Sequence, residues 1–155
     1  SRRITEPDLG PLFSEAEETD DLPTGYIYVL RSKSDDPFIA QNRSVIHKIG
    51  VTGGDVKVRI VNAKKDPTYL LADVEIVATF KLANINRKRL EALLHKFFGN
   101  ARLEVKLSDR FGAKVESREW FLVPLAVIEE AIQKLMEGAI ENFRYDPETA
   151  QIVGI

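Results

Sequence analysis

A chain of 155 residues with 44% hydrophobic residues is long enough for one domain with a hydrophobic core. It contains no cysteine, which excludes a disulfide framework, a thiol nucleophile and a cysteine-based zinc site. Because only two histidines are present, oxygen ligands would have to hold any metal, which favours Mg²⁺ or Mn²⁺. No apolar run approaches the roughly 20 residues that span a bilayer, so we expect a cytoplasmic protein without a membrane partner.

The charge distribution is uneven along the chain. The net charge of −2 divides into −5 for residues 1–24, +6 for residues 25–136 and −3 for residues 137–155. A basic body is typical of a phosphate binder, although a solvated surface without a ligand explains it equally well. The acidic, proline-containing residues 1–24 predict a flexible segment, and the initial Ser1 suggests a piece of a longer parent chain.

Two short runs rich in β-branched and aromatic residues, 25–30 and 47–52, predict a pair of strands. If they pair antiparallel, the two-residue period puts Tyr28 and Lys48 on the same face of the ribbon. A phenol would then lie beside an ammonium group. The long polar connection between Ser32 and Ile46 is expected to border a substrate cleft.

A helix is expected after the second strand, with Asp55 as its N-cap and an apolar stripe that begins at Val56. At the edge of this stripe, Arg59 can lean over the first strand pair. The alternative is an exposed Arg59 that pairs with Asp55. Three lysines at more exposed positions could contact phosphates or simply be solvated: Lys57, Lys64 and Lys65.

The run Val74–Lys81 predicts a third strand, and Asn84 or Asn86 is expected to cap the most amphipathic helix of the chain. Glu91 borders the apolar face of this helix, with Arg87 one turn before it and His95 one turn after it. Such a charged stripe is usually a solvated flank. His95 remains ambiguous between a substrate contact and a partner of Glu91.

The last third of the chain predicts two more strands, near 103–107 and 114–123, joined by a turn at 108–113. Trp120 or Phe121 should be core, and the simplest role for Glu119 is to pair with Arg118 or Arg102. Pro124 then opens a final helix.

These motifs resemble those of the GIY-YIG nuclease superfamily over roughly Gly25 to Val123. Tyr26-Ile27-Tyr28 stands in the place of the first motif, although Tyr26 replaces its glycine. Lys48-Ile49-Gly50 stands in the place of the second, where Lys48 replaces a tyrosine. The lysine form resembles a branch of the superfamily that also carries a Glu-Trp-Phe, matched by residues 119–121. The arginine and glutamate that such proteins carry on later helices would be Arg59 and Glu91.

The resemblance implies an α+β fold in which a small antiparallel β-sheet is flanked by helices, with an extra C-terminal helix. Its domains would be an acidic segment (1–24), a nuclease-like domain (25–123) and a C-terminal helix and tail (124–155).

The implied activity is that of an endonuclease that hydrolyses DNA with Mg²⁺ or Mn²⁺ held by Glu91. The implied catalytic residues are Tyr28 as general base, with Tyr26 as the other nearby phenol, and Lys48, Arg59, Glu91 and His95. The implied nucleic-acid contacts are Lys57, Lys64, Lys65 and Arg87.

The expected partners are DNA and additional domains of the parent chain. Two other functions remain open: an inactive module that binds nucleic acid or docks to a protein, and a purely structural appendage of a larger protein. Salt-dependent DNA binding would separate the structural appendage from the other two.

Overall fold

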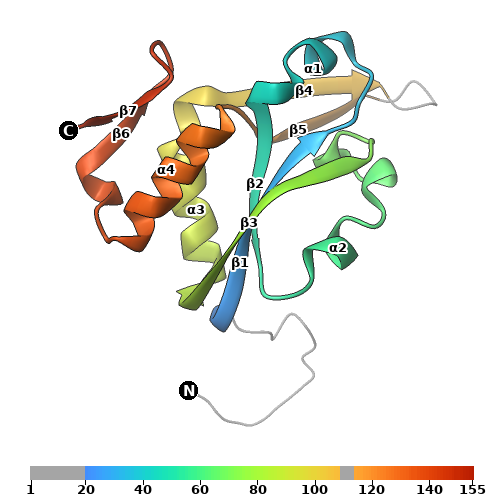
Figure 1. Ribbon diagram of the computed structural model, residues 1–155. Helices are drawn as coiled ribbons and strands as arrows, with labels where there is room; N and C mark the ends of the chain where they lie inside the picture. Colours follow the sequence, from blue (N-terminus) through green and yellow to red (C-terminus); the bar gives the residue numbers. More distant parts are fainter. Residues whose placement is uncertain (1–19, 109–113) are drawn as a thin grey trace, which may run out of the picture.

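The computed structural model describes residues 20–108 and 114–155 of the chain. The expected α+β class is confirmed: an antiparallel five-stranded sheet lies between helices, and a helix follows it near the C-terminus (Figure 1). The strand order in the sheet is β3-β1-β2-β5-β4. Its strands are β1 (Asp21–Ser32), β2 (Ile46–Thr52), β3 (Val74–Asn86), β4 (Arg102–Ser108) and β5 (Lys114–Leu122).

The helices lie on both faces of this sheet (Figure 1). They are α1 (Pro37–Gln41), α2 (Val56–Arg59), α3 (Arg87–Phe97) and α4 (Leu125–Met136). Within the described residues, 3₁₀ turns complete the connections: η2 (Arg43–Val45), η3 (Ala63–Lys65), η4 (Pro67–Tyr69), η5 (Gly99–Ala101) and η6 (Ile140–Asn142). After η6, a separate hairpin is formed by β6 (Phe143–Asp146) and β7 (Gln151–Gly154).

Each face of the sheet is buried against its own set of helices. Ile27 and Val29 pack with α3 and α4 on one face, and Tyr28 and Leu30 pack with Val56 and the η4 segment on the other. The run Ile27–Leu30 is therefore completely buried. For the same reason Trp120 and Phe121 are both core residues, where the alternation predicted only one of them.

Several expected boundaries shift in the structure. The first strand begins at Asp21, so the end of the segment expected to be flexible lies in β1. The third strand continues to Asn86, and a bulge opposite Val29 and Leu30 breaks its alternation. Asn86 is the N-cap of α3, which confirms one of the two alternatives expected from the sequence. The turn expected at 108–113 lies largely outside the described residues.

The helix after β2 is much shorter than its apolar stripe predicts. Asp55 caps it as expected, because its carboxylate accepts a hydrogen bond from the Lys57 amide at 2.8 Å. The helix nevertheless ends at Arg59, and 3₁₀ turns lead on to β3. The region is rich in β-branched residues, which lose side-chain freedom in a helix. The long connection after β1 also differs from the expected loop, because it contains α1 and η2.

His47 is a completely buried polar residue in β2. Its Nε2 accepts a hydrogen bond from Arg31 Nε at 3.0 Å, so the proton resides on Nδ1, which donates to the Val123 carbonyl at 2.7 Å. Burial lowers the pKa of His47 from 6.5 to about 4; the bond to Val123 opposes this shift and the charge of Arg31 adds to it. The neutral imidazole is thus part of the folded sheet.

We expect acid to destabilise the fold through His47. The unfolded chain binds a proton at this residue below about pH 6.5 and the folded chain only below about pH 4, so stability falls as the pH falls through this window. The total loss should be about 3 kcal/mol. Urea unfolding at several pH values measures it. His47→Gln, whose amide offers one donor and one acceptor, should flatten the dependence; an equal slope in both proteins contradicts the assignment.

Candidate functional site

Tyr28 lies at the centre of the sheet, with Gly50 opposite it on β2. A Cβ atom built on Gly50 would come within 2.3 Å of the phenol oxygen of Tyr28. Real Cβ atoms do not approach this closely, so the glycine provides the space in which the Tyr28 ring lies across the neighbouring strand.

We therefore expect Gly50→Ala to displace the Tyr28 ring. An overpacked core position costs about 1–3 kcal/mol of stability, and the hydroxyl would leave its present partners. Thermal unfolding measures the loss of stability. Gly99→Ala is the matched control, since a Cβ at Gly99 meets no atom within 4 Å. Equal melting temperatures for the two variants would contradict the close approach.

Arg59 lies over the same face, as expected, and its pairing with Asp55 is not observed. Its Nε donates a hydrogen bond to the Tyr28 hydroxyl at 2.9 Å. Asp55 instead caps α2, and the buried Val56 anchors that short helix on the sheet. One turn of helix after this anchor is enough to aim the guanidinium at the phenol.

Lys48 is confirmed on the same face as Tyr28 and is only 2% exposed. Its ammonium nitrogen lies 5.5 Å from the ring centre of Tyr28 and 5.3 Å from that of Tyr69. The same nitrogen is 3.3 Å from a carboxylate oxygen of Glu119. Glu119 therefore pairs with Lys48 and not with Arg102, because β5 runs beside β2; the side chain of Arg118, the other predicted partner, lies outside the described residues. Arg102 instead lies over the ring of Phe121.

Tyr69 belongs to the site and was missed by the sequence analysis. Its hydroxyl interacts with that of Tyr28, so that each phenol affects the pKa of the other. The η4 turn that carries it is fixed to the sheet, because Trp120 Nε1 donates to the Thr68 carbonyl at 2.9 Å. The sequence shows only that Tyr69 follows shortly after Asp66 and Pro67. This position does not indicate which side chain Tyr69 contacts.

The pKa of Tyr28 is raised above its ordinary value of 10.0. Burial raises it most, the charge and hydrogen bond of Arg59 lower it, the charge of Glu91 raises it, and the interaction with Tyr69 lowers it. Of the two nearby cations, Arg59 lowers this pKa, while the ammonium group of Lys48 is paired with Glu119.

Glu91 and His95 hold the edge of β2. Beside β5, β2 is paired only from Ile46 to Lys48, so the next backbone groups on that edge need other partners. The Val51 amide donates to Glu91 Oε2 at 3.2 Å, and the His95 ring bonds to the Ile49 carbonyl at 2.8 Å. His95 thus contacts the strand and not Glu91, and its predicted substrate contact stays a prediction.

The Glu91 carboxylate lies at the edge of β2, where its charge still acts on the phenol. Its charge raises the pKa of Tyr28 and contributes to the raised pKa of Arg59. The structure therefore brings together Tyr28, Lys48, Arg59 and Glu91, which come from β1, β2, α2 and α3. A tyrosine-centred site is defined by these four residues together with Tyr69 and Glu119.

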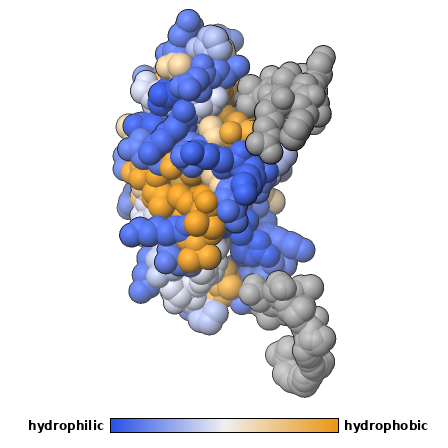
Figure 2. Space-filling view, turned by 90° about the vertical axis from the view of Figure 1, so that its right-hand side faces the viewer, coloured by the Kyte–Doolittle hydropathy of each residue, from blue (hydrophilic) through white to orange (hydrophobic). Residues whose placement is uncertain are grey.

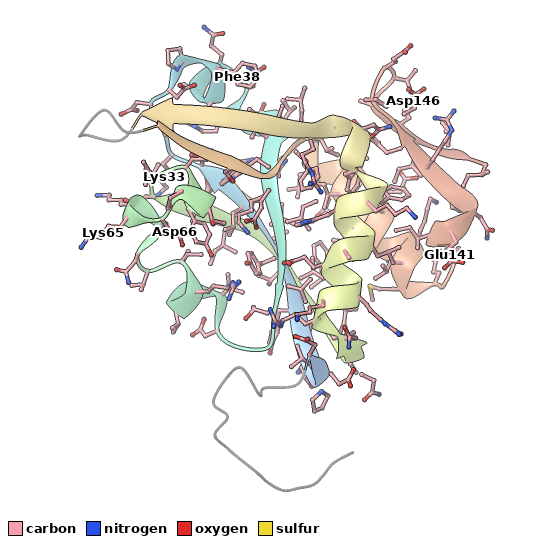
Figure 3. The ribbon with its side chains drawn as sticks, turned by 180° about the vertical axis from the view of Figure 1, so that it is seen from behind. Lys33, Phe38, Lys65, Asp66, Glu141 and Asp146 are labelled. Carbon is pink, nitrogen blue, oxygen red and sulfur yellow. The ribbon has the colours of Figure 1, made fainter. Side chains whose placement is uncertain are left out.

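The remaining predicted residues are more dispersed. Tyr26 is half-buried on the same strand as Tyr28. Arg87 is tied to Asp20 by a salt bridge of 2.7 Å. The three lysines expected at phosphates are exposed; Lys64 lies 3.5 Å from Asp73, and Lys65 projects outward from the η3 segment (Figure 3).

The donor set around Glu91 suits only one kind of metal site. Among the described residues, no three His, Asp or Glu side chains come together as ligands. Magnesium commonly takes one or two carboxylates and completes its shell with substrate oxygens and water. Glu91 therefore fits a magnesium ion that the protein and a bound phosphate would hold jointly.

Fold and site together define an α+β domain with phenol, guanidinium and ammonium groups on one face of an antiparallel sheet and the Glu91 carboxylate at the edge of β2. The chain belongs to the T5orf172 domain family, whose model matches residues 25–136. This is a family of nuclease-like, DNA-binding domains. The assignment to the GIY-YIG superfamily is therefore wrong: it depended on short motifs, two of which depart from the pattern, whereas the family model matches most of the chain.

A longer relative is known. The chain is 38% identical over 135 residues to the "Uncharacterized protein YeeC" of Bacillus subtilis (strain 168). The match covers 87% of the chain but only 35% of that protein, so the chain spans about a third of its relative. No solved structure gave a significant match. Within the described residues, no helix is long and apolar enough to cross a membrane.

Proposed function

We propose that the chain is an endonuclease domain that hydrolyses DNA phosphodiester bonds at the tyrosine-centred site with the help of a divalent metal ion. The observation that carries the proposal is the 2.9 Å hydrogen bond from Arg59 Nε to the Tyr28 hydroxyl, two groups on which the charge of Glu91 also acts. Phosphodiester hydrolysis needs an activated water and positive charge for the developing phosphorane oxygens. The family supports the substrate class.

In this proposal, Tyr28 receives the proton of the attacking water. Its phenolate form is favoured by the positive charge of Arg59 and by the interaction with the Tyr69 hydroxyl. Burial acts in the opposite direction, so only a small fraction of Tyr28 is ionised at neutral pH in the free protein. Arg59 then stabilises the negative charge that develops on the phosphate.

Lys48 has a structural part in this proposal. Held by Glu119 and lying over both tyrosine rings, it fixes the two phenols relative to each other. Glu91 would hold Mg²⁺ or Mn²⁺, which would supply Lewis-acid polarisation of the phosphate when bound. The exposed Lys57, Lys64 and Lys65 would contact DNA phosphates away from the scissile bond.

One observation favours a second candidate, a DNA-binding module that does not cleave. Each charged residue of the site has a partner within the fold: Lys48 binds Glu119, Arg59 binds Tyr28, and Glu91 binds the Val51 amide. Such residues could be structural. A longer parent chain, as in the relative, would then supply the activity.

A plasmid-nicking assay with Mg²⁺ or Mn²⁺ separates the two candidates. We expect nicking by the wild-type chain, loss of nicking with a chelator, and recovery when metal is added back. Salt-dependent DNA binding without nicking would instead support the binding module.

A further inference from the structure

A hollow with a volume of about 660 Å³ lies on the α2 side of the sheet. Its wall is formed by Tyr26 on β1, by residues 53–57 at the start of α2, and by Ile76 and Thr79 on β3. Figure 2 shows this side of the molecule, with an apolar area in its middle and hydrophilic residues around it. The volume is typical of a site for a small organic group.

The hollow adjoins the tyrosine-centred site at three points. Tyr26 lies two residues before Tyr28 on β1, so the two side chains share a strand face and their Cα atoms are about 7 Å apart. Val56 and Ile76 pack in the same cluster as Tyr28. Arg59, one turn of α2 after Val56, donates to the Tyr28 hydroxyl. A group bound in the hollow would therefore lie within one nucleotide of a phosphate at Tyr28.

The walls suit a flat aromatic ring. Tyr26 offers a half-buried phenol ring, and Val56 and Ile76 offer aliphatic surface. The hollow is open at Gly54, in the turn before α2, because a Cβ atom built on this glycine would meet no atom closer than the Thr52 hydroxyl at 4.0 Å. Thr79 is exposed and adds a hydroxyl that can donate or accept.

The rim of the hollow carries charged residues at the start of α2. Lys57 lines it and is exposed, and Arg59 follows within the same short helix; Asp55 also lines it, with its carboxylate accepting the Lys57 amide as the helix cap. An apolar floor with an aromatic wall and cations at the rim is the combination by which proteins bind single-stranded nucleic acid, where bases stack on aromatic rings and cations follow the backbone.

We propose that this hollow binds one unpaired nucleobase, stacked on Tyr26, of the nucleotide next to the phosphate that is cleaved. The inference rests on the proposed function and narrows its substrate class. The substrate would be DNA that is single-stranded or locally unpaired at the cleavage position, because a base inside an intact duplex cannot enter a hollow beside the sheet.

The inference also gives Tyr26 a role different from that of an alternative base. In a stacking role the aromatic ring matters and the hydroxyl does not. Tyr26→Phe should therefore bind DNA as tightly as the wild type, whereas Tyr26→Ala should bind it more weakly. If Tyr26 acted as a base, Tyr26→Phe and Tyr26→Ala would lose cleavage alike.

The test is an abasic scan of a short single-stranded oligonucleotide, read by fluorescence anisotropy. The full chain with Glu91→Gln is used in Mg²⁺ so that the DNA stays intact, and one nucleotide at a time is made abasic. We expect one position at which the missing base weakens binding about fivefold to hundredfold, the range of a single base–aromatic stack. Tyr26→Ala in the same background should abolish this penalty, and Tyr26→Phe should retain it.

A uniform response along the oligonucleotide, or an equal penalty in the Tyr26→Ala protein, would overturn the proposal. Melting temperatures of the Tyr26 variants show whether each is folded. If Tyr26→Ala is not folded, Tyr26→Phe is used to test the inference. Failure of the nuclease function gives a different pattern: the position-specific penalty remains while plasmid nicking by the wild-type chain is absent.

Discussion

Glu91→Gln is expected to abolish DNA cleavage while leaving the protein as stable as the wild type. Glu91 Oε2 accepts a hydrogen bond from the Val51 amide at 3.2 Å, and the amide oxygen of glutamine accepts the same bond. The negative charge that would hold a metal is lost. Cleavage should fall at least about a thousandfold, because a metal ion contributes several kcal/mol to such reactions. Nicking rates and melting temperatures measure the two effects separately.

Glu91→Ala is the matched control for this substitution. It removes both the charge and the acceptor, so the Val51 amide on the uncovered edge of β2 loses its partner. We expect the same loss of cleavage together with a loss of about 1 kcal/mol of stability, or about 2–4 °C in melting temperature. Full nicking activity in Glu91→Gln would show that Glu91 only supports the sheet edge and would remove the proposed metal ligand.

The shared face of Tyr28 and Lys48 could be predicted because it depends on local periodicity alone. Side chains two residues apart share a strand face, and the antiparallel pairing of β1 with β2 brings the two residues together. Arg59 could be placed for a similar reason, since Asp55 fixes the start of its helix. The general position of the site was therefore present in the sequence pattern.

The partners of these residues could not be predicted, because they depend on the packing of distant segments. Glu119 meets Lys48 only because β5 lies beside β2, and no periodicity specifies which strands are neighbours. Tyr69 reaches Tyr28 through a 3₁₀ turn that Trp120 fixes from across the sheet. The edge role of Glu91 and His95 likewise follows from where β5 ends its pairing with β2.

Family membership illustrates a related limit. Short strand motifs such as Tyr26-Ile27-Tyr28 have the composition that a buried strand needs in any case, because β-branched and aromatic residues favour strands. Gly50 is required by the ring of Tyr28, so part of the second motif also has a steric cause within this fold. Motifs of three residues therefore carried less information than the match over residues 25–136.

The role of Tyr28 as a base leads to a second prediction with a large effect. Tyr28→Phe should lower the cleavage rate about 10²- to 10⁴-fold, the usual contribution of a positioned base. Because the pKa of Tyr28 lies above 10.0, its ionised fraction grows about tenfold per pH unit through the neutral range. The wild-type rate should rise with nearly that slope between about pH 6.5 and 8.5, and the residual rate of the variant should rise less steeply.

The substitution Tyr69→Phe tests whether Tyr28 acts as a base or is only packed in the core. It removes the hydroxyl whose interaction lowers the pKa of Tyr28 but leaves the Tyr28 hydroxyl and its bond to Arg59 in place. We expect a rate several-fold below that of the wild type, with the same pH slope, because the ionised fraction is smaller at every pH while the reacting group is unchanged. A Tyr28→Phe protein that keeps both the rate and the pH slope of the wild type would exclude Tyr28 as the base.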